Sequence, residues 1–477
     1  MTVSVKRVRV GISPACELAG RKRLWAALEA THAVRFLACD TSERGDLDAI
    51  VRLGTDAQPP SAAIPQLSML GEEGARGAPR PLELADDPAL ARALRGAKLS
   101  DAWAAPGERG LEPTDRDVVL ARLGGAPAWV LAPGLAAHHR VVCAPVELEQ
   151  GEALRERLQA GRCLALLALV QFLRDLDPRF EPARPRAAFV IDDPNLHWPS
   201  YGHIRYAELL RHAREHGYHL AIAMTPLDGW LAHPRAVRVF REGAAHLSIC
   251  IHGNDHDGPE LGREVSWPEN LARASQALSR SAAFAKRTGL TVERVMVPPH
   301  ERLTEAAAQA LAICGFQAIC TTRPYPWIAD SADVSWLQGP PAVAALSGWG
   351  PAELVAGGLP MLLRTDFLYP REDHVLRAFL GQPTILYGHH DLLADGMDVL
   401  EQATHELNRI GDVQWSSLGE IARAALTPGA APSDVQASDV QPSDAHRTGQ
   451  VAASPTRLRP VLRRLLSEGR DRLQAIG

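Results

Sequence analysis

The sequence predicts an α/β protein whose larger part is a distorted (β/α)7-type barrel, preceded by a smaller open α/β domain. Three observations lead to this expectation: seven short apolar runs separated mostly by helical patterns, polar side chains directly after several of those runs, and a length of 477 residues. A chain of this length exceeds one ordinary core and indicates more than one domain. Parallel strands joined by crossover helices bring their carboxyl ends to one face, so one shared site is expected there.

Composition shifts divide the chain into segments. We expect an N-terminal α/β domain over residues 1–145, a bridging helical segment over 146–186, the barrel over 187–426, a flexible linker over 427–456 and a basic amphipathic tail helix over 457–477. The linker contains the consecutive units PSDVQ, ASDVQ and PSDAH, which are too polar to bury a core. Arginines surround an apolar stripe in the tail, which favours docking on the protein itself or contact with a partner.

The first domain is expected to open as a β-α-β unit, with strands at Arg7–Ile12 and Ala33–Ala38 around a helix at Glu17–Thr31. A further helix is expected at Asp46–Leu53, followed by a loop rich in Pro, Gly, Ala and Ser at Thr55–Pro79. No glycine-rich phosphate-binding motif follows the first strand, so a bound nucleotide is not indicated. We expect this domain to serve in packing or in gating the substrate.

A long helical stretch at Glu149–Leu176 is expected to lead into the barrel. The barrel strands are the short apolar runs that follow. They are Ala187–Ile191, His219–Ala223, Leu247–Ile251, Arg294–Val297, Gln317–Thr321, Met361–Arg364 and Pro383–Tyr387. The clearest helical patterns between them are Tyr206–His216, Asn270–Thr288 and Glu305–Cys314.

Two adjacent carboxylates, Asp192 and Asp193, stand directly after the first barrel strand. Neighbouring anions at the mouth of an apolar strand resist desolvation, so a cation is expected beside them, most simply a metal ion. His252 and His256 follow a later strand, and a turn of helix would bring both imidazoles to one face. One aspartate and two histidines leave a coordination position open, which is typical of a catalytic metal site.

With these two pairs on successive strand ends, residues 187–424 resemble the NodB-homology polysaccharide deacetylases of carbohydrate esterase family four. The resemblance implies that Asp192 is the general base. It also implies that Asp193, His252 and His256 bind a divalent metal ion, most often Zn²⁺.

The same family places a histidine near the end of a late strand as general acid. The stretch TILYGHHD offers both His389 and His390 for this role, and strand alternation does not decide between them.

Three departures indicate a divergent branch of the family. The usual Arg-x-Pro stretch, whose arginine orients the base, corresponds to VPPHE here, with Val297 near the arginine position. His300 and Arg302 are the nearest candidates to replace that arginine. Gly253 stands where a Ser or Thr is usual, and the first strand continues DDPNLHW instead of DDG.

Residues after two of the strand ends are candidates for substrate binding. They are Asn195, His197, Trp198, Pro299, His300 and Glu301. The indole of Trp198 offers a stacking face for a sugar, although aromatic side chains more often pack in a core. His300 and Glu301 have an equally simple alternative, a hydrogen-bonded pair that only braces the loop.

These residues suit a metal-dependent hydrolase that removes an N- or O-acetyl group from a sugar or glycan precursor. The ion lowers the pKa of its bound water, a carboxylate takes the proton, and a histidine protonates the leaving group. No GxSxG elbow supports a serine nucleophile. The alternatives are another metal-dependent amide or glycoside hydrolase on the same barrel, and a non-catalytic degenerate deacetylase domain that binds a glycan or a partner.

Charge and hydropathy exclude other classes. The chain has 51 Lys and Arg against 56 Asp and Glu, which argues against nucleic acid as the partner. The most apolar helix-like run is too short to span a bilayer, and the N-terminus lacks the apolar centre of a signal peptide, so we expect a cytoplasmic protein. The 7 cysteines include no CxxC pair and are expected to be reduced.

Overall fold

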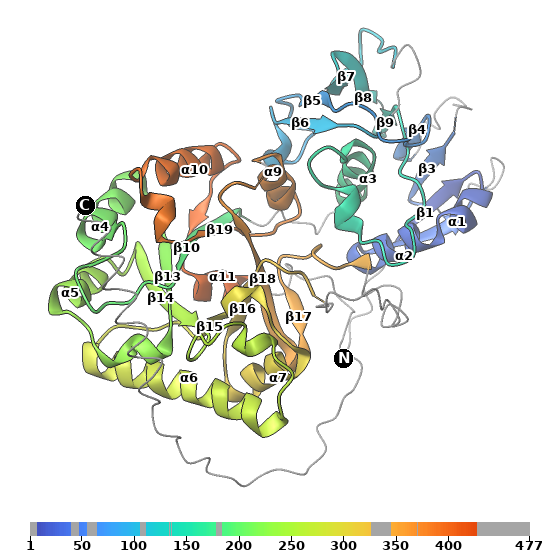
Figure 1. Cartoon of the computed structure of the whole chain (residues 1–477). Helices are drawn as coiled ribbons and strands as arrows, with labels where there is room; N and C mark the ends of the chain where they lie inside the picture. The colour runs from blue at the N-terminus through green and yellow to red at the C-terminus, as the bar shows by residue number, and fades with distance from the viewer. Residues whose placement is uncertain are drawn as a thin grey trace.

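The structure is a computed structural model that describes most of the chain as far as Leu426. The described ranges are 7–39, 47–54, 64–104, 111–132, 136–177, 184–325, 345–369 and 371–426, together with residue 134. The predicted linker over 427–456 and the predicted tail helix over 457–477 lie outside them. The described residues form an open sheet with helices packed on it and, beside it, a closed barrel (Figure 1).

The larger body, within the described ranges, is a seven-stranded parallel barrel. Its strands are β10 (Arg186–Asp192), β13 (Leu220–Met224), β14 (Leu247–His252), β15 (Val295–Val297), β16 (Ala318–Thr321), β18 (Leu359–Asp366) and β19 (Thr384–Gly388), in that order around the ring. Strand β13 pairs with β10 as well as with β14, and this pairing closes the ring. Each strand overlaps one of the predicted apolar runs to within one or two residues, so the predicted barrel is confirmed.

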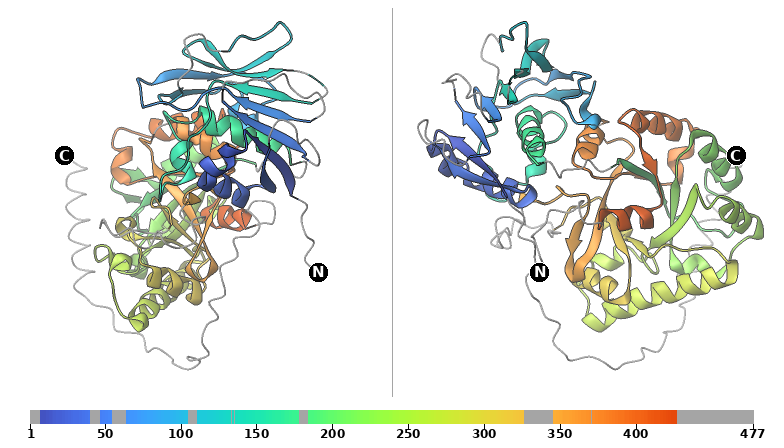
Figure 2. Two further views of the ribbon diagram at one scale, coloured as in Figure 1. Left: turned by 90° about the vertical axis from the view of Figure 1, so that its right-hand side faces the viewer. Right: turned by 180° about the vertical axis from the view of Figure 1, so that it is seen from behind.

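Helices surround the barrel (Figure 2). They are α4 (Tyr206–His216), α5 (Pro234–Glu242), α6 (Trp267–Thr288), α7 (Glu305–Cys314), α9 (Arg371–Phe379), α10 (Asp398–Asn408) and α11 (Leu418–Ala425). Helix α7 shows why the predicted bounds agree with the structure: the Thr304 side chain accepts from the Ala307 amide at its start, and Gly315 has a left-handed conformation just after its end.

Small and apolar side chains fill the barrel interior. Ala188 and Val190 on β10 lie in one buried cluster with Cys250 on β14 and Leu362 on β18. Helix α11 adds its apolar face to the same cluster, and the short strand β20 (Gln414–Trp415) before it pairs with the start of β10. Helix α11 therefore closes the end of the barrel where β10 begins, which leaves the carboxyl ends of the strands for a site.

The smaller body is an open mixed sheet of nine strands in the described residues. They are β1 (Val8–Ser13), β2 (Val34–Ala38), β3 (Ala49–Leu53), β4 (Gln66–Met69), β5 (Arg80–Leu84), β6 (Lys98–Asp101), β7 (Val118–Leu123), β8 (Ala126–Ala132) and β9 (His138–Val141). The order is β2-β1-β3-β4-β9-β8-β7-β5-β6, parallel from β2 to β9 and antiparallel from β9 to β6. Helices α1 (Cys16–Gly20) and α2 (Lys22–Thr31) follow the first strand, as expected.

Three local expectations for the first half of the chain are wrong. Where a helix was expected at Asp46–Leu53, the structure has strand β3. All residues of β3 are buried, so its sequence shows neither a helical nor an alternating pattern of apolar residues. Strand β4 lies inside the loop expected at Thr55–Pro79. The long helix expected at Glu149–Leu176 is a 3-10 turn at Leu154–Arg157 followed by the shorter helix α3 (Leu164–Asp175).

Helix α3 is part of the N-terminal core. Every residue from Leu164 to Leu173 is buried, and all of these side chains except Gln171 share one apolar cluster with the strands of the open sheet. The carboxylate of Asp101, at the end of β6, accepts from the amides of Cys163 and Leu164 at 2.9 Å each. This contact stabilises the start of α3, where amide groups have no partner within the helix.

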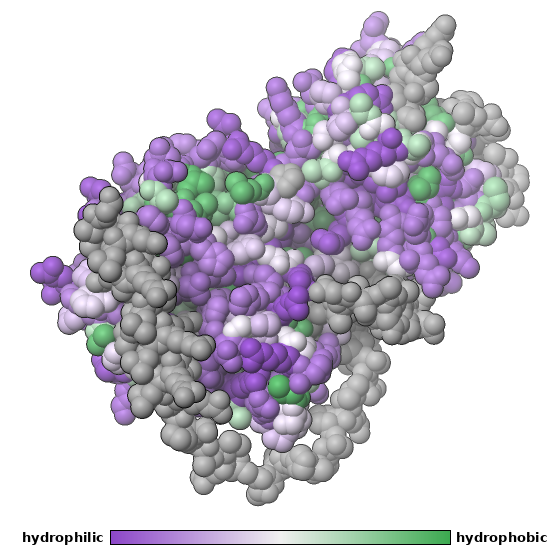
Figure 3. Space-filling view, in the orientation of Figure 1, coloured by the Kyte–Doolittle hydropathy of each residue, from purple (hydrophilic) through white to green (hydrophobic). Residues whose placement is uncertain are grey.

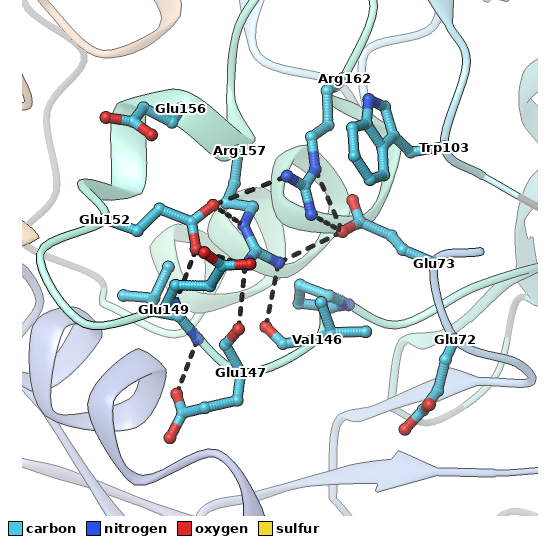
Figure 4. A network of polar contacts seen from close by, with 12 residues as sticks. Glu72, Glu73, Trp103, Val146, Glu147, Glu149, Glu152, Glu156, Arg157 and Arg162 are labelled. Atoms are coloured by element: carbon cyan, nitrogen blue, oxygen red, sulfur yellow. Dashed lines mark hydrogen bonds and ion pairs between the residues drawn. The ribbon is translucent and has the colours of Figure 1, made fainter. Parts of the chain in front are cut away.

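A buried ionic network fixes the segment that leads into α3 (Figure 4). Arg157 is 2% exposed and binds the carboxylate of Glu152 and the carbonyl oxygen of Glu147. Arg162 donates to Glu73 at 2.7 Å, and its guanidinium lies 4.1 Å from the centre of the Trp103 ring. Because both arginines are paired, their burial does not leave isolated charges.

Helix α9 joins the two bodies (Figure 1). It follows barrel strand β18, yet Leu376 and Phe379 belong to the apolar cluster of the N-terminal domain. Its acidic residues bind the same domain: Glu372 accepts from the Ser100 amide at 3.0 Å, and Asp373 accepts from the Ala160 amide at 2.5 Å.

In the part of the chain that the structure describes, no helix is both long and apolar enough to cross a membrane. The face of the molecule in Figure 3 is mostly hydrophilic, and hydrophobic residues form small separate groups on it.

Candidate metal centre and active site

The register of the barrel strands places polar side chains at the open end of its interior. Side chains alternate along a strand, so Asp192 follows Ala188 and Val190 on the inner side of β10. By the same alternation His252 follows Cys250 on β14, and Arg364 follows Leu362 on β18. Asp192, His252 and Arg364 are each 2% exposed or less. A buried polar layer therefore lies on top of the apolar interior.

Asp193, His252 and His256 come together above this layer. Their ligand atoms lie within 4.8 Å of one another. The Nε2 atom of His252 is 3.6 Å from Asp193 Oδ1, and that of His256 is 3.4 Å from the same oxygen. The three predicted metal ligands thus converge on one point, and Asp193 and His256 are partly exposed there.

The donor chemistry of this group fits a divalent transition-metal ion. Two imidazoles and one carboxylate are the ligand types that zinc binds in catalytic sites. The Nδ1 atom of His252 is 2.9 Å from the carbonyl oxygen of Val297. A carbonyl only accepts, so Nδ1 carries the proton and Nε2 is left as the ligand atom. This support from β15 fixes the ring of His252.

His256 is held by a loop rather than by the expected turn of helix. The chain leaves β14 at His252, and the carboxylate of Glu260 accepts from the amides of Asn254 at 2.6 Å and His256 at 3.1 Å. Gly253 has φ of +63°, and a Cβ atom there would overlap the Glu260 carboxylate and lie 2.6 Å from Pro299. The glycine at the position where Ser or Thr is usual is therefore required by the close approach of Glu260.

Strained backbone is concentrated around this group. Among the described residues other than glycine, those with positive φ are Asp193, His256, His300 and Glu301, at 79°, 54°, 56° and 57°. A left-handed conformation is costly for such residues and persists where the surrounding structure enforces it, as it often does at functional sites. Two of the four are candidate metal ligands, which indicates that the loops are shaped for the site.

Arg364 is the cation beside Asp192. Its guanidinium makes two parallel hydrogen bonds to the carboxylate, at 2.8 Å to Oδ1 and 2.6 Å to Oδ2. Burial alone would raise the pKa of Asp192, but Arg364 and His252 outweigh it and hold the pKa below its usual value. The sequence pattern predicted the arginine that orients the base near Val297, and it did not identify Arg364. The signal was a charged residue inside a buried strand, which requires a partner.

Glu301 braces the same arginine from the other side. Its carboxylate accepts from Arg364 Nε at 3.0 Å, from the Thr321 hydroxyl at 2.9 Å and from the Thr322 amide at 2.7 Å. The ring of Tyr387 lies 4.1 Å from the guanidinium. Glu301 is thus engaged by the protein on several sides, whereas its neighbour His300 is exposed, with its ring 5.4 Å from that of His256.

The two candidate acids occupy different places. His389 lies beside the ligand group, with Nε2 3.9 Å from Asp193 Oδ2 and 54% of its side chain exposed. His390 turns toward the hairpin of β11 (Ser200–Tyr201) and β12 (Ile204–Arg205), where its ring centre is 5.5 Å from that of Tyr201. A Cβ atom on Gly202 would overlap the His390 ring, so the hairpin packs closely on it.

The candidate substrate residues after β10 also differ among themselves. Asn195 and His197 are 2% and 3% exposed. Asn195 accepts from the His197 amide at 3.1 Å, and His197 Nε2 donates to the Asp228 carbonyl at 2.8 Å, so both support the loop. Trp198 is 45% exposed. Of these three side chains, Trp198 is the most exposed. Pro299 is buried beside Gly253.

A closed seven-stranded barrel with an Asp-His-His group and a buried, arginine-bound aspartate at one end is the arrangement expected of a NodB-like polysaccharide deacetylase fold. Comparison with known proteins found no matching family model and no matching curated protein.

Solved structures similar to the chain include carbohydrate deacetylases and esterases. One is the peptidoglycan deacetylase PdaC from Bacillus subtilis, at 12% identity and a TM-score of 0.29, covering 51% of this chain and 93% of that one. Another is a family 4 carbohydrate esterase from Streptomyces lividans, at 12% identity and 0.25, covering 52% and 91%. A family 4 pseudoenzyme from Bacillus anthracis matches at 10% identity and 0.28, covering 49% and 68%.

Proposed function

We propose that the protein is a metal-dependent hydrolase that removes an acetyl group, most simply an N-acetyl group, from a sugar or glycan precursor. The observation that carries this proposal is the pairing of a three-ligand group, Asp193, His252 and His256, with a separate buried carboxylate, Asp192, that Arg364 keeps ionised. A structural metal site has no use for a second, ionised carboxylate beside its ligands. A hydrolytic site needs one to accept a proton from water.

The residues at this end of the barrel would have distinct roles in the proposed reaction. A zinc ion held by the three ligands would supply positive charge that polarises the acyl oxygen and lowers the pKa of water. Asp192 accepts the proton of the attacking water, and Arg364 with Glu301 holds its carboxylate in place. As the C–N bond breaks, His389 gives a proton to the leaving nitrogen, so that acetate and a free amine are formed. Trp198 offers a face for the sugar ring.

Metal content tests the ligand assignment. Replacing Asp193 or His252 with Ala should lower the zinc content by about one equivalent per chain, because a three-ligand site loses most of its affinity with one ligand. Asp257→Ala is the matched control, since this carboxylate lies in the same loop, is 77% exposed and pairs with Arg263 rather than with the ligand group. Mass spectrometry of protein purified without chelators measures the content.

Zinc content equal to wild type in both ligand variants would contradict the assignment. A second outcome would favour the non-catalytic glycan-binding alternative. In that case the variants lose zinc, but the wild type releases no acetate from any acetylated amino sugar.

Leaving-group dependence separates His389 from His390. His389→Ala should reduce hydrolysis of an acetylated amino sugar by about 10²–10³, since a general acid contributes roughly that much. An aryl acetate, whose leaving group needs no proton, should lose far less. His390→Ala serves as the control for the pair, because its ring packs on Tyr201 and not on the ligand group. Equal losses on both substrates in His389→Ala would mean that this residue is not the acid.

A further inference from the structure

A second group of potential metal ligands lies on the outside of the barrel. His212 and His216 are one helical turn apart on α4, and Glu401 and His405 are one turn apart on α10. Helices α4 and α10 follow the neighbouring strands β10 and β19 and lie side by side (Figures 1 and 2). The two pairs face each other, and His216 Nε2 is 3.9 Å from Glu401 Oε2.

We propose that His212, His216, Glu401 and His405 form a second zinc site, which joins α4 to α10. Three imidazoles and one carboxylate make the closed four-ligand set of a structural site. The ligand atoms of His212, His216 and Glu401 lie within 4.8 Å of one another. Atoms bound to one zinc ion lie about 3–4 Å apart, and a small change in side-chain torsion covers the difference.

His405 completes the set from the same side. Its ring centre is 6.1 Å from that of His216, and its side chain is exposed, so binding of the same ion requires His405 to turn toward the other three ligands. The rings of His212 and His216 are already 4.2 Å apart. The two imidazoles on α4 therefore already lie close enough together to bind one ion.

The orientation of His212 supports the same assignment. Its Nδ1 atom is 3.0 Å from the hydroxyl of Tyr218, a residue with no exposed surface. When Nδ1 donates its proton to that oxygen, Nε2 is left as the ligand atom, as is usual for histidines with a hydrogen-bond partner behind a metal. Glu215 and Asp398 add negative charge near His212, which favours a divalent cation.

The zinc site would link helix α4 to helix α10. The strands that precede these helices, β10 and β19, lead to candidate active-site residues. Strand β10 before α4 ends in Asp192 and leads to Asp193, and β19 before α10 leads to His389. Zinc binding at the surface would therefore stabilise the barrel at the seam between these strands without taking part in the reaction.

Zinc binding in a chain that lacks the first site tests the proposal. The full-length Asp193→Ala/His252→Ala chain should bind one zinc ion in isothermal titration with zinc chloride, and its melting temperature should rise with zinc. Adding His216→Ala should weaken binding at least tenfold and abolish that rise. Adding Glu401→Gln, which keeps the shape of the side chain, should weaken binding as well. Glu242→Gln, the same change of charge on an exposed residue of the neighbouring helix α5, should leave it unchanged.

No zinc uptake by the Asp193→Ala/His252→Ala chain would overturn the proposal, and so would uptake that neither His216→Ala nor Glu401→Gln affects. The Glu401→Gln result stands even if His216→Ala fails to fold. Because the first site is removed throughout, the outcome is independent of whether the proposed deacetylase function is correct.

Discussion

Asp192→Asn should reduce hydrolysis of an acetylated amino sugar by about 10³ while leaving the zinc content at the wild-type value. The amide keeps the size of the carboxylate but cannot accept a proton from water, and a general base contributes roughly 10²–10⁴ to such reactions. The side chain is buried and bound by Arg364, so it is not one of the three converging ligands. Acetate release and metal content are measured on the same preparation.

A comparison with the ligand variants sharpens this prediction. Loss of activity together with loss of zinc in Asp192→Asn would mean that the residue helps to hold the metal. Full activity would mean that another group accepts the proton. Asp257→Asn, a neutralised and exposed aspartate in the His256 loop, should behave as wild type in both assays.

Arg364→Met should lower the free energy of unfolding by about 3–5 kcal/mol at neutral pH, the cost typical of removing one partner from a buried ion pair. Methionine is unbranched and uncharged, and it leaves the buried Asp192 and the largely buried Glu301 without their shared cation. Urea unfolding of the two proteins measures the difference. Arg184→Met is the matched control, since its pair with Asp412 is 51% and 60% exposed and such pairs contribute about 0–1 kcal/mol.

The pH dependence of this effect has a definite sign. The pKa of Asp192 is lowered in the folded protein, so its ionised form stabilises the fold at pH values above the unfolded pKa of about 4. That contribution is lost as the pH falls through the folded pKa. The difference between wild type and Arg364→Met should therefore be complete at pH 7 and decrease in acid. Adding Asp192→Asn and Glu301→Gln to Arg364→Met should restore part of the stability, and no recovery would argue against the ion-pair explanation.

The barrel could be predicted from the sequence because its strands are buried on both sides. Runs such as Ala187–Ile191 are continuously apolar, and helices such as α4 have a polar face, so the two patterns differ clearly. The antiparallel strands of the first domain have weaker sequence patterns than the barrel strands. Strands β5 and β6, with sequences RPLEL and KLSD, are short, contain charged residues, and become recognisable only through their pairing with each other.

The candidate site, like the fold, could be predicted only in part from the sequence. Residues that follow strand ends in a motif, such as Asp193 and His252, could be named because parallel strands bring those ends together. Arg364 could not, since it is 172 positions from Asp192 and only the closure of the barrel makes them neighbours. The conformation of the His256 loop depends on Glu260 and on the strain at His256, and neither has a pattern in the sequence.

The packing of helix α9 into the apolar core of the N-terminal domain bears on whether the barrel could be produced alone. A fragment beginning near residue 184 would expose Leu376 and Phe379, which the N-terminal domain covers, and would leave the carboxylates of Glu372 and Asp373 without their amide partners. The N-terminal domain therefore covers the apolar side of α9. At α9 the barrel and the N-terminal domain therefore form one packed structure.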